Sequence, residues 1–577
     1  MISGVPLEVR SLISAAALII VAACGTPVPP GPPNPATFPR TRAELTGFRE
    51  TSRYADVTRF LDSLRALRAP LAFGSIGKTN EGREIPYVIA SRPLVNSPSA
   101  AKILGRPIVY VQGNIHAGEV EGKDALLALL RDLAFADKPN ALDSIVLIAV
   151  PIYNADGNER FKSQSVNRTE QNGPELVGVR ANAQNLDLNR DYVKAEAPET
   201  RASLAMFNTW DPDVFVDLHT TNGSYHGYAL TYSPSLNPAA VFGGIYARDS
   251  LLPVLRERMR TRHSFETFDY GNFLSDERAD VSDTTVREGW ATYDPRPRFG
   301  TDYYGIRGRI AILSEAYSHD PFERRVRSTS AFVNEILSLV GERGGAIRSL
   351  SARADSQPLG WGRSPDSLRM VSVRSQLTAT PLMMDVIKED LEKTGDSSIT
   401  QPGVPRGMRR TGRFRPVRMP VYDRFTSTLD RTAPAAYVLA PEDTAAVTLL
   451  RLHGIRVDRS DTAWTARGES FVIDTISTAQ RPFQGHREVR LKGHWERSLQ
   501  TLPAKSFIVS TAQPRGALIV YLLEPESEDG FTTWNLFDSR LQKGGRFPVR
   551  RIFDLSRRGR GAAIRRSSAS TQPQPQL

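Results

Sequence analysis

The feature that most constrains the fold of this chain is an alternation of short apolar runs with amphipathic stretches. Residues 107–113 (PIVYVQG) have the continuous apolar character of a buried strand, and residues 120–135 have the apolar spacing of an amphipathic helix. Further apolar runs predict strands at residues 144–153, 213–218 and 309–313. Strands that alternate with helices indicate an α/β fold, in which a sheet is layered by helices. Active-site residues of such sheets usually lie at the carboxyl ends of strands.

The pattern changes in the second half of the chain. Residues 342–363 are rich in glycine, serine and arginine, and residues 405–420 hold six arginines and no acid. Later apolar segments are short, which indicates a smaller α+β or β-rich domain. A chain of 577 residues is long enough for two or three domains. We predict an α/β domain over residues 41–345, an accessory domain over 346–555 and a disordered basic tail over 556–577.

The first residues have the pattern of an export signal. Residues 11–23 (SLISAAALIIVAA) form an apolar run as long as a signal-peptide core, too short to cross a bilayer as a helix. Cys24 follows two alanines and precedes a proline-rich stretch, which resembles the bacterial lipoprotein signal. The alternative is an ordinary secretory signal with an incidental cysteine. We expect a signal peptide over residues 1–23, a stiff linker over 24–40, and an exported protein held at a membrane of the bacterial cell envelope through lipidated Cys24.

Cysteine content and charge exclude several classes of protein. Cys24 is the only cysteine, which excludes an internal disulfide framework, a cysteine-based zinc knuckle and an iron–sulfur cluster. The net charge is +11, but no recognisable nucleic-acid-binding module interleaves the arginines with aromatic residues. We therefore expect no nucleic-acid partner. The arginines of residues 405–418 and 557–566 either face anionic lipid or wall polymer or, as we favour, are simply solvated.

Polar residues that can bind a metal follow three of the predicted strands. His116 and Glu119 come directly after the first strand, His219 ends the strand near residue 218, and Glu315 follows the last strand. A His-x-x-Glu pair can place an imidazole nitrogen and a carboxylate oxygen on one metal, with the third ligand supplied from elsewhere. The alternatives are hydrogen-bonded structural histidines and a solvated acid at the end of a strand.

Two similar patterns do not support a site. His263 and Glu266 have the same spacing as the first pair but follow no predicted strand. The segment with Gly118 and Gly122 imitates a phosphate-binding loop, yet only three residues separate these glycines and Asp124 follows the lysine. A phosphate cradle requires four intervening residues and a serine or threonine after the lysine, so we reject it.

Six motifs occur in a characteristic order: NEGREI, GNIHAGE, NADG, LDLNRD, DLHT and ILSEAY. Together they resemble the zinc metallocarboxypeptidases, the carboxypeptidase A-like enzymes, over roughly residues 45–340. This resemblance implies a mixed sheet between helices, with one Zn²⁺ at the carboxyl edge of the sheet. It also implies that His116, Glu119 and His219 bind the metal and that Asp187 orients a metal-bound imidazole.

The same resemblance implies roles for the residues that act on the substrate. Glu315 matches the general base, and Asn189 with Arg190 matches the pair that holds the terminal carboxylate of the substrate. The arginine that polarises the scissile carbonyl is either Arg168 or Arg180, and we choose Arg180 although Gln184 lies closer to the LDLNRD motif. A tyrosine closes over the substrate in this family. Tyr303 and Tyr304 both qualify, and Tyr304 is the residue we name.

The motifs therefore predict a metallocarboxypeptidase that hydrolyses the last peptide bond of a peptide with a free C-terminal carboxylate. One alternative is an amidase or peptidase that trims peptidoglycan stem peptides. The other is a non-catalytic protein that binds peptides through a zinc fold, and Gln184 is the only feature that favours it. For Asn189 and Arg190, the alternative to substrate binding is a turn with a surface ion pair. No sequence feature indicates an oligomeric state.

Overall fold

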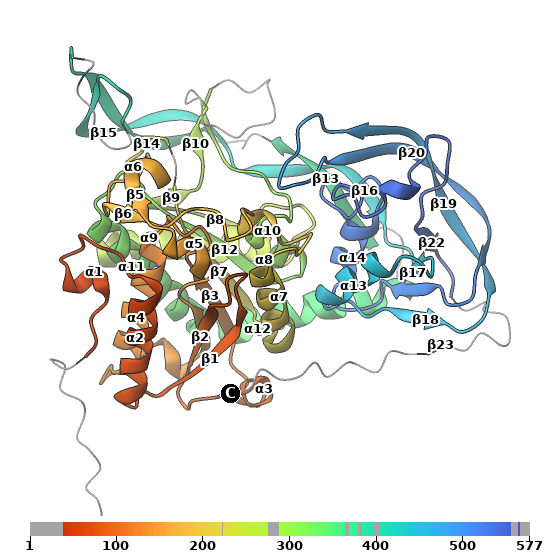
Figure 1. The fold of residues 1–577 in the computed structure, drawn as a ribbon, viewed down its shortest axis with the longest axis horizontal. Coiled ribbons are helices and arrows are strands. Elements are labelled where there is room, and N and C mark those ends of the chain that lie inside the picture. Colours follow the sequence, from red (N-terminus) through yellow and green to blue (C-terminus); the bar gives the residue numbers. More distant parts are fainter. Residues whose placement is uncertain are drawn as a thin grey trace, which may run out of the picture. The chain divides into compact units, whose positions relative to one another are not determined.

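The computed structural model describes residues 38–221, 223–274, 288–363, 369–378, 383–396, 398, 404–555 and 564–565. The expected signal peptide, Cys24 and nearly all of the expected linker lie outside these residues, as does most of the basic tail. Within the described part of the chain, no helix is both long enough and apolar enough to cross a membrane. The contacts group residues from Pro39 onward into one compact unit, and Figure 1 shows its elements.

A mixed sheet of eight strands forms the centre of the first part of the chain. Its strand order is β1-β2-β4-β3-β7-β12-β8-β9. The strands span β1 Leu71–Lys78, β2 Glu84–Ala90, β3 Ile108–Gly113, β4 Val146–Val150, β7 Val214–Thr220, β8 Leu230–Pro234, β9 Thr267–Asp269 and β12 Ile310–Ala316. The four central strands β4, β3, β7 and β12 are parallel, whereas β2 and β8 run antiparallel to their central neighbours. The expected mixed α/β sheet is confirmed.

Helices cover both faces of this sheet, which explains the continuous apolar runs of its central strands. Val109 and Val111 face one core with helices α2 Tyr54–Ala66, α4 Glu121–Ala134, α9 Leu252–His263 and α11 Phe322–Glu342. Ile108 and Tyr110, on the opposite side of β3, face the other core with α7 Pro198–Trp210 and α10 Gly300–Ile306. Other α-helices and strands of this part are α1 Arg42–Leu45, α3 Pro98–Leu104, α5 Ala155–Glu159, α6 Gln164–Asn167, α8 Gly243–Tyr246, α12 Gly344–Ser356, β5 Lys162–Ser163 and β6 Leu176–Val177.

The C-terminal part is rich in strands, as the sequence predicts. A seven-stranded sheet has the order β20-β19-β22-β17-β21-β18-β23. Its elements are β17 Ala436–Leu439, β18 Asp458–Ser460, β19 Trp464–Thr478, β20 Val489–Leu502, β21 Phe507–Ser510, β22 Arg550–Ile552 and β23 Ile564–Arg565, with helices α13 Thr444–Leu452 and α14 Gly516–Leu523. Strands β19 and β20 form a long antiparallel hairpin.

One hydrophobic core is shared between the two parts of the chain. Phe207 and Tyr303 from the first part belong to the same buried cluster as Leu450, Leu518 and Phe531 from the second. The core therefore continues across residue 345. The division of the chain at that residue into two domains stays a prediction.

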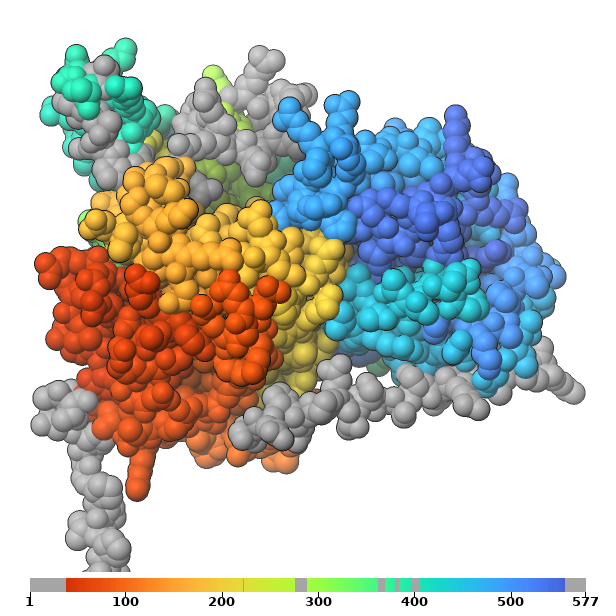
Figure 2. Space-filling model, viewed as in Figure 1, coloured from red at the N-terminus to blue at the C-terminus, as the bar shows by residue number. Residues whose placement is uncertain are grey.

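The arginine-rich segment forms an antiparallel arm. Strands β14 Met383–Lys393 and β15 Met408–Tyr422 pair with each other and join β10 Asn272–Phe273 and β11 Trp290–Ala291 in a second sheet; β13 Met370–Thr378 pairs with β16 Arg424–Thr432. Figure 2 shows the arm in teal at the upper left. Its arginines face acids on the adjacent strand: Arg415 lies 2.9 Å from Asp390, and Arg418 lies 3.5 Å from Asp385. These exposed ion pairs offset part of the positive charge of the segment.

Candidate active site

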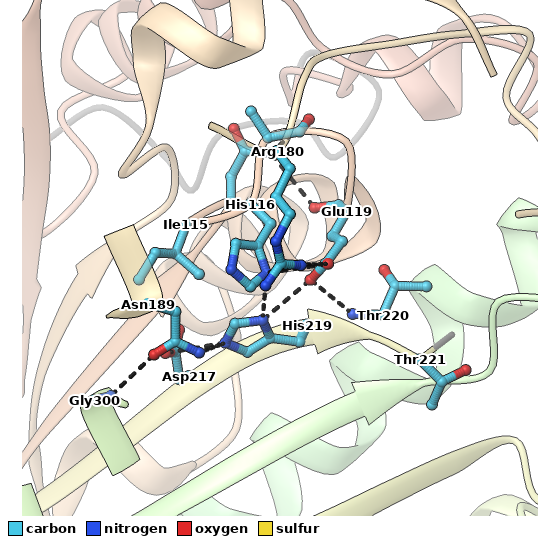
Figure 3. Close-up of polar contacts among 12 residues, drawn as sticks. Ile115, His116, Glu119, Arg180, Asn189, Asp217, His219, Thr220, Thr221 and Gly300 are labelled. Carbon is cyan, nitrogen blue, oxygen red and sulfur yellow. Dashed lines mark hydrogen bonds and ion pairs between the residues drawn. The ribbon is translucent and has the colours of Figure 1, made fainter. Parts of the chain in front are cut away.

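Three buried side chains converge at the carboxyl ends of neighbouring parallel strands. His116 and Glu119 follow β3, and His219 lies near the end of β7, which pairs with β3. Their possible ligand atoms all lie within 4.8 Å of one another. Glu119 Oε1 is 3.0 Å from His116 Nδ1, and Glu119 Oε2 is 3.0 Å from His219 Nδ1 (Figure 3). Two imidazoles and one carboxylate are the ligand set of a catalytic zinc site, so the residues present fit this metal.

A carboxylate lies beside Nε2 of each of the two histidine rings. Asp187 Oδ1 lies 3.0 Å from His116 Nε2, and Asp217 Oδ2 lies 3.0 Å from His219 Nε2. A carboxylate at Nε2 keeps the proton on that nitrogen and leaves the lone pair of Nδ1 for a metal. Gln112 in turn donates a 3.1 Å hydrogen bond to Asp217. Each ring thus presents Nδ1 toward the centre of the triad.

The sequence motifs predict the role of Asp187 but not that of Asp217. The signal was present in the motif DLHT, because side chains two positions apart on a strand point to the same side of the sheet. Asp217 is therefore placed beside His219 by the strand itself. Gln112 lies opposite Asp217 in the parallel register of β3 and β7, which brings its amide within reach.

Burial and charge shift the pKa values in this cluster. Burial disfavours the imidazolium of His219, but Asp217 and Glu119 outweigh that effect and raise the pKa of His219 well above its usual value. Burial likewise disfavours the charged form of Glu119, yet His116 and Arg168 hold the pKa of Glu119 well below its usual value. The cluster therefore holds an ionised carboxylate among cationic groups, and a divalent cation that binds there would displace the Nδ1 proton of His219.

Glu315 lies beside the triad. It is the penultimate residue of β12, where the parallel register places it opposite His219, and it lines the same pocket of about 100 Å³ as the three ligands. Burial raises the pKa of Glu315 to about 8, and the positive charge of His219 acts in the opposite direction. A carboxyl group with a pKa near neutrality is suited to accept and return a proton.

Asn189 and Arg190 line the pocket from the short 3₁₀ turn Leu188–Arg190. Asn189 accepts a 2.9 Å hydrogen bond from the backbone N–H of Gly300. The guanidinium of Arg190 lies 3.9 Å above the centre of the Phe299 ring. Stacking on an aromatic ring fixes the plane of a guanidinium while its N–H groups remain able to bind a carboxylate. We call Asn189 and Arg190 the carboxylate clamp.

The structure distinguishes the two candidate arginines. Arg180 lines the pocket, where its Nη1 lies 3.1 Å from His116 Nδ1 and its Nε donates a 2.9 Å hydrogen bond to Asp187. Arg168 is buried and donates to Glu119 and to the carbonyl oxygens of Thr220 and Thr221. Arg168 therefore supports the loop after β7, and Arg180 is the arginine that faces the pocket. Gln184 does not line it.

The choice of Tyr304 requires correction, because neither Tyr304 nor Tyr303 reaches the pocket. Tyr304 is fully buried and stacks on Phe207 with 3.8 Å between the ring centres. The hydroxyl of Tyr303 lies 2.7 Å from His453 Nδ1 in the core shared with the C-terminal part. Helix α10 packs on α7 and the sheet, so both tyrosines belong to the core.

Two other tyrosines line the pocket, Tyr270 after β9 and Tyr293 after β11. Both lie more than 20 residues before Glu315 in the sequence, whereas Tyr303 and Tyr304 lie within 12 residues of it. No motif surrounds either of them. Their position depends on the course of the chain between β9 and α10, which apolar periodicity does not indicate.

Comparison with known proteins agrees with this geometry. Residues 57–267 match the family model described as zinc carboxypeptidase, and this segment contains the metal triad and the carboxylate clamp. This part of the chain is therefore similar to zinc carboxypeptidases. Glu315 lies beyond the matched residues and is placed at the site by the structure.

The chain is similar to several carboxypeptidases. It is 22% identical to Carboxypeptidase 2 of Trichophyton equinum over 501 residues, which covers 82% of this chain and 81% of the relative. It is 33% identical to Carboxypeptidase D of Mus musculus over 159 residues, 25% of this chain and 10% of the relative. A crystal structure of a metallo-carboxypeptidase from Burkholderia cenocepacia aligns with a TM-score of 0.37 and 17% identity, covering 51% of this chain and 70% of that one.

Proposed function

We propose that this protein is a zinc-dependent metallocarboxypeptidase that binds one Zn²⁺ and removes the C-terminal residue of peptides. The proposal rests on one observation. His116, Glu119 and His219 line the same pocket as Glu315 and the carboxylate clamp. When bound, zinc supplies a Lewis acid that polarises a carbonyl and lowers the pKa of water. A base, a cation and a carboxylate-binding pair beside the metal site are the groups that hydrolysis of a terminal peptide bond needs.

Each side chain has one task in this proposal. Asn189 and Arg190 bind the terminal carboxylate of the peptide, which places its last peptide bond over the metal site. Arg180 donates hydrogen bonds to the carbonyl oxygen as negative charge develops on it. Glu315 takes a proton from the attacking water and passes it to the nitrogen of the leaving amine.

A matched pair of peptides tests the proposal. The two peptides have the same sequence, one with a free C-terminal carboxylate and one with a C-terminal amide. The amide lacks the charge that Arg190 binds, and charge-assisted hydrogen bonds contribute about 1.5–3 kcal/mol each. We expect kcat/KM for the amide to be lower by at least about 100-fold. Equal rates, or cleavage only of peptidoglycan stem peptides, would contradict a general carboxypeptidase.

We further propose that the protein is exported and attached to the bacterial cell envelope through a lipid on Cys24. The support is the apolar run of residues 11–23, the two alanines before Cys24 and the proline-rich stretch after it. We expect the full-length protein expressed in bacteria to enter the detergent phase on Triton X-114 partition. The Cys24→Ser variant should move to the aqueous phase, and equal partition of the two proteins would contradict the lipid anchor.

A further inference from the structure

The hairpin between β19 and β20 ends in a tight turn with an unusual residue in it. Phe483 and His486 exchange two backbone hydrogen bonds of 2.7 and 3.0 Å, with Gln484 and Gly485 between them. Both central residues have positive φ, +51° for Gln484 and +83° for Gly485. Two positive φ angles are the signature of a type I′ turn, which favours asparagine or glycine at the first position. Glutamine costs roughly 1 kcal/mol there, and a strained residue of this kind often marks a functional contact.

The side chain of Gln484 contacts the metal site. Its Oε1 accepts a 2.8 Å hydrogen bond from the backbone N–H of Asp187, 297 residues away in the chain. The carboxylate of Asp187 in turn binds His116, Arg180 and the backbone N–H of Asn189. Gln484 therefore holds the residue that links the metal triad to the carboxylate clamp.

A second contact from the same turn holds the other end of the clamp loop, residues 187–197. His486 Nε2 lies 2.8 Å from the carboxylate of Glu196. Glu196 also pairs with Lys194, which pairs with Asp191 in the middle of the loop. The hairpin thus contacts the loop on both sides of Asn189 and Arg190.

A third contact from the C-terminal part holds the residues that touch the clamp. Asp529, fully buried in the C-terminal part, accepts hydrogen bonds from the backbone N–H and the side chain of Arg298. The next two residues, Phe299 and Gly300, are those that support Arg190 and Asn189 (Figure 3 shows Gly300 and Asn189). The C-terminal part therefore fixes both members of the clamp through neighbours that they touch.

We propose that Gln484 is a positioning residue for the carboxylate clamp, and that holding this clamp is a role of the C-terminal part. The inference rests on the proposed carboxypeptidase function. It agrees with the extent of similarity to the Trichophyton equinum protein: residues 1–345 are 345 of 577 residues, about 60% of the chain, whereas the similarity covers 82% and so extends into the C-terminal part.

Variants that relieve the strained turn and break the contact test this proposal. Gln484→Gly and Gln484→Asn both suit a positive φ, and neither reaches Asp187 N. We expect Tm to stay equal or to rise, while KM for a blocked dipeptide substrate rises about 3- to 10-fold and kcat changes less than about 2-fold. A rise of KM alone is expected because the clamp binds ground state and transition state alike. Amide hydrogen exchange of residues 187–197 should accelerate.

Lys505→Gly is the matched control. Lys505 also has a positive φ, +68°, but it lies in a loop whose contacts are with Ser460, Arg459 and Asp461. This variant should raise or preserve Tm and leave KM and the exchange of residues 187–197 unchanged. Unchanged KM and unchanged exchange in both Gln484 variants would overturn the positioning role. If the wild-type enzyme cleaves no peptide, the proposed function fails. Amide hydrogen exchange of residues 187–197 would still decide whether Gln484 holds the loop.

Discussion

Asp217 and Asp187 give the two histidines of the triad the same ring orientation from different elements. Asp217 shares strand β7 with His219, whereas Asp187 reaches His116 from the loop that carries the carboxylate clamp. Both carboxylates stand next to Nε2, so Nδ1 of each ring would be the atom that holds zinc. The metal site and the substrate clamp are therefore joined through a single residue, Asp187.

Asp217→Asn should weaken zinc binding. An amide holds the Nε2 proton less strongly than a carboxylate, and loss of such a partner typically costs about 10- to 100-fold in metal affinity. We expect a rise of about that size in the zinc Kd measured by competition with a chelator. Asp132→Asn, at an exposed position of α4, should leave the Kd unchanged. Equal affinities of Asp217→Asn and wild type would show that Asp217 does not orient His219.

Arg180 and Arg168 should respond differently to substitution. Arg180→Gln removes a donor that faces the pocket, and loss of such a donor typically lowers kcat about 100- to 1,000-fold. Arg168→Gln instead leaves Glu119 and two carbonyl oxygens without a buried cation, so we expect a lower Tm. Steady-state kinetics and thermal unfolding of both variants separate the two roles. An Arg180→Gln enzyme with unchanged kcat would contradict the assignment.

The elements that the sequence predicts well are those buried on both faces. The apolar runs at β3, β4, β7 and β12 each lie between two helical layers, so their pattern is continuous and easily read. The motifs also place the ligands, Asp187 and the clamp, because these residues stand directly at strand ends or in short turns. The roles of Tyr304 and Gln484 could not be predicted from the sequence. The position of Tyr304 depends on which side of α10 faces the core. The role of Gln484 depends on a contact between residues 297 positions apart in the chain.

The contact between the hairpin and the clamp loop should depend on pH. The hydrogen bond to Glu196 raises the pKa of His486, although burial acts against it. The stabilisation is therefore fully present below the unfolded pKa of about 6.5 and is lost as pH rises through the higher folded value. Because this pair is partly exposed, we expect less than about 1 kcal/mol.

His486→Asn tests this dependence. Wild type should have the larger free energy of unfolding at pH 6, and the difference between the two proteins should shrink by pH 9. Denaturant unfolding at both pH values measures it. A difference that stays constant or grows between pH 6 and pH 9 would contradict a charged His486–Glu196 pair.

At the scale of the whole molecule, the C-terminal part completes the core of the catalytic part. Tyr303 and Phe207 belong to the same buried cluster as residues of α13 and α14, and His453 bonds to both Tyr303 and the carbonyl oxygen of Val193. A chain that stops at residue 345 would expose this surface to water, at a cost of roughly 25 cal/mol for each Å² of apolar area.

We therefore expect residues 39–345 alone to aggregate or to unfold without cooperativity. Size-exclusion chromatography and thermal unfolding of the truncated and full-length proteins measure this directly. A soluble monomer of residues 39–345 that unfolds cooperatively and binds zinc would contradict the shared core and support two independent domains.

In the proposed reaction, Glu315 and a zinc ion on the triad remove C-terminal residues from peptides. The most direct measurement is mass spectrometry of a mixed peptide library after incubation with three samples: the zinc-loaded protein, its Glu315→Gln variant and the chelated protein. We predict loss of single C-terminal residues with the first sample alone. Cleavage at internal bonds, equal cleavage by Glu315→Gln, or no cleavage by protein shown to contain zinc would contradict the claim.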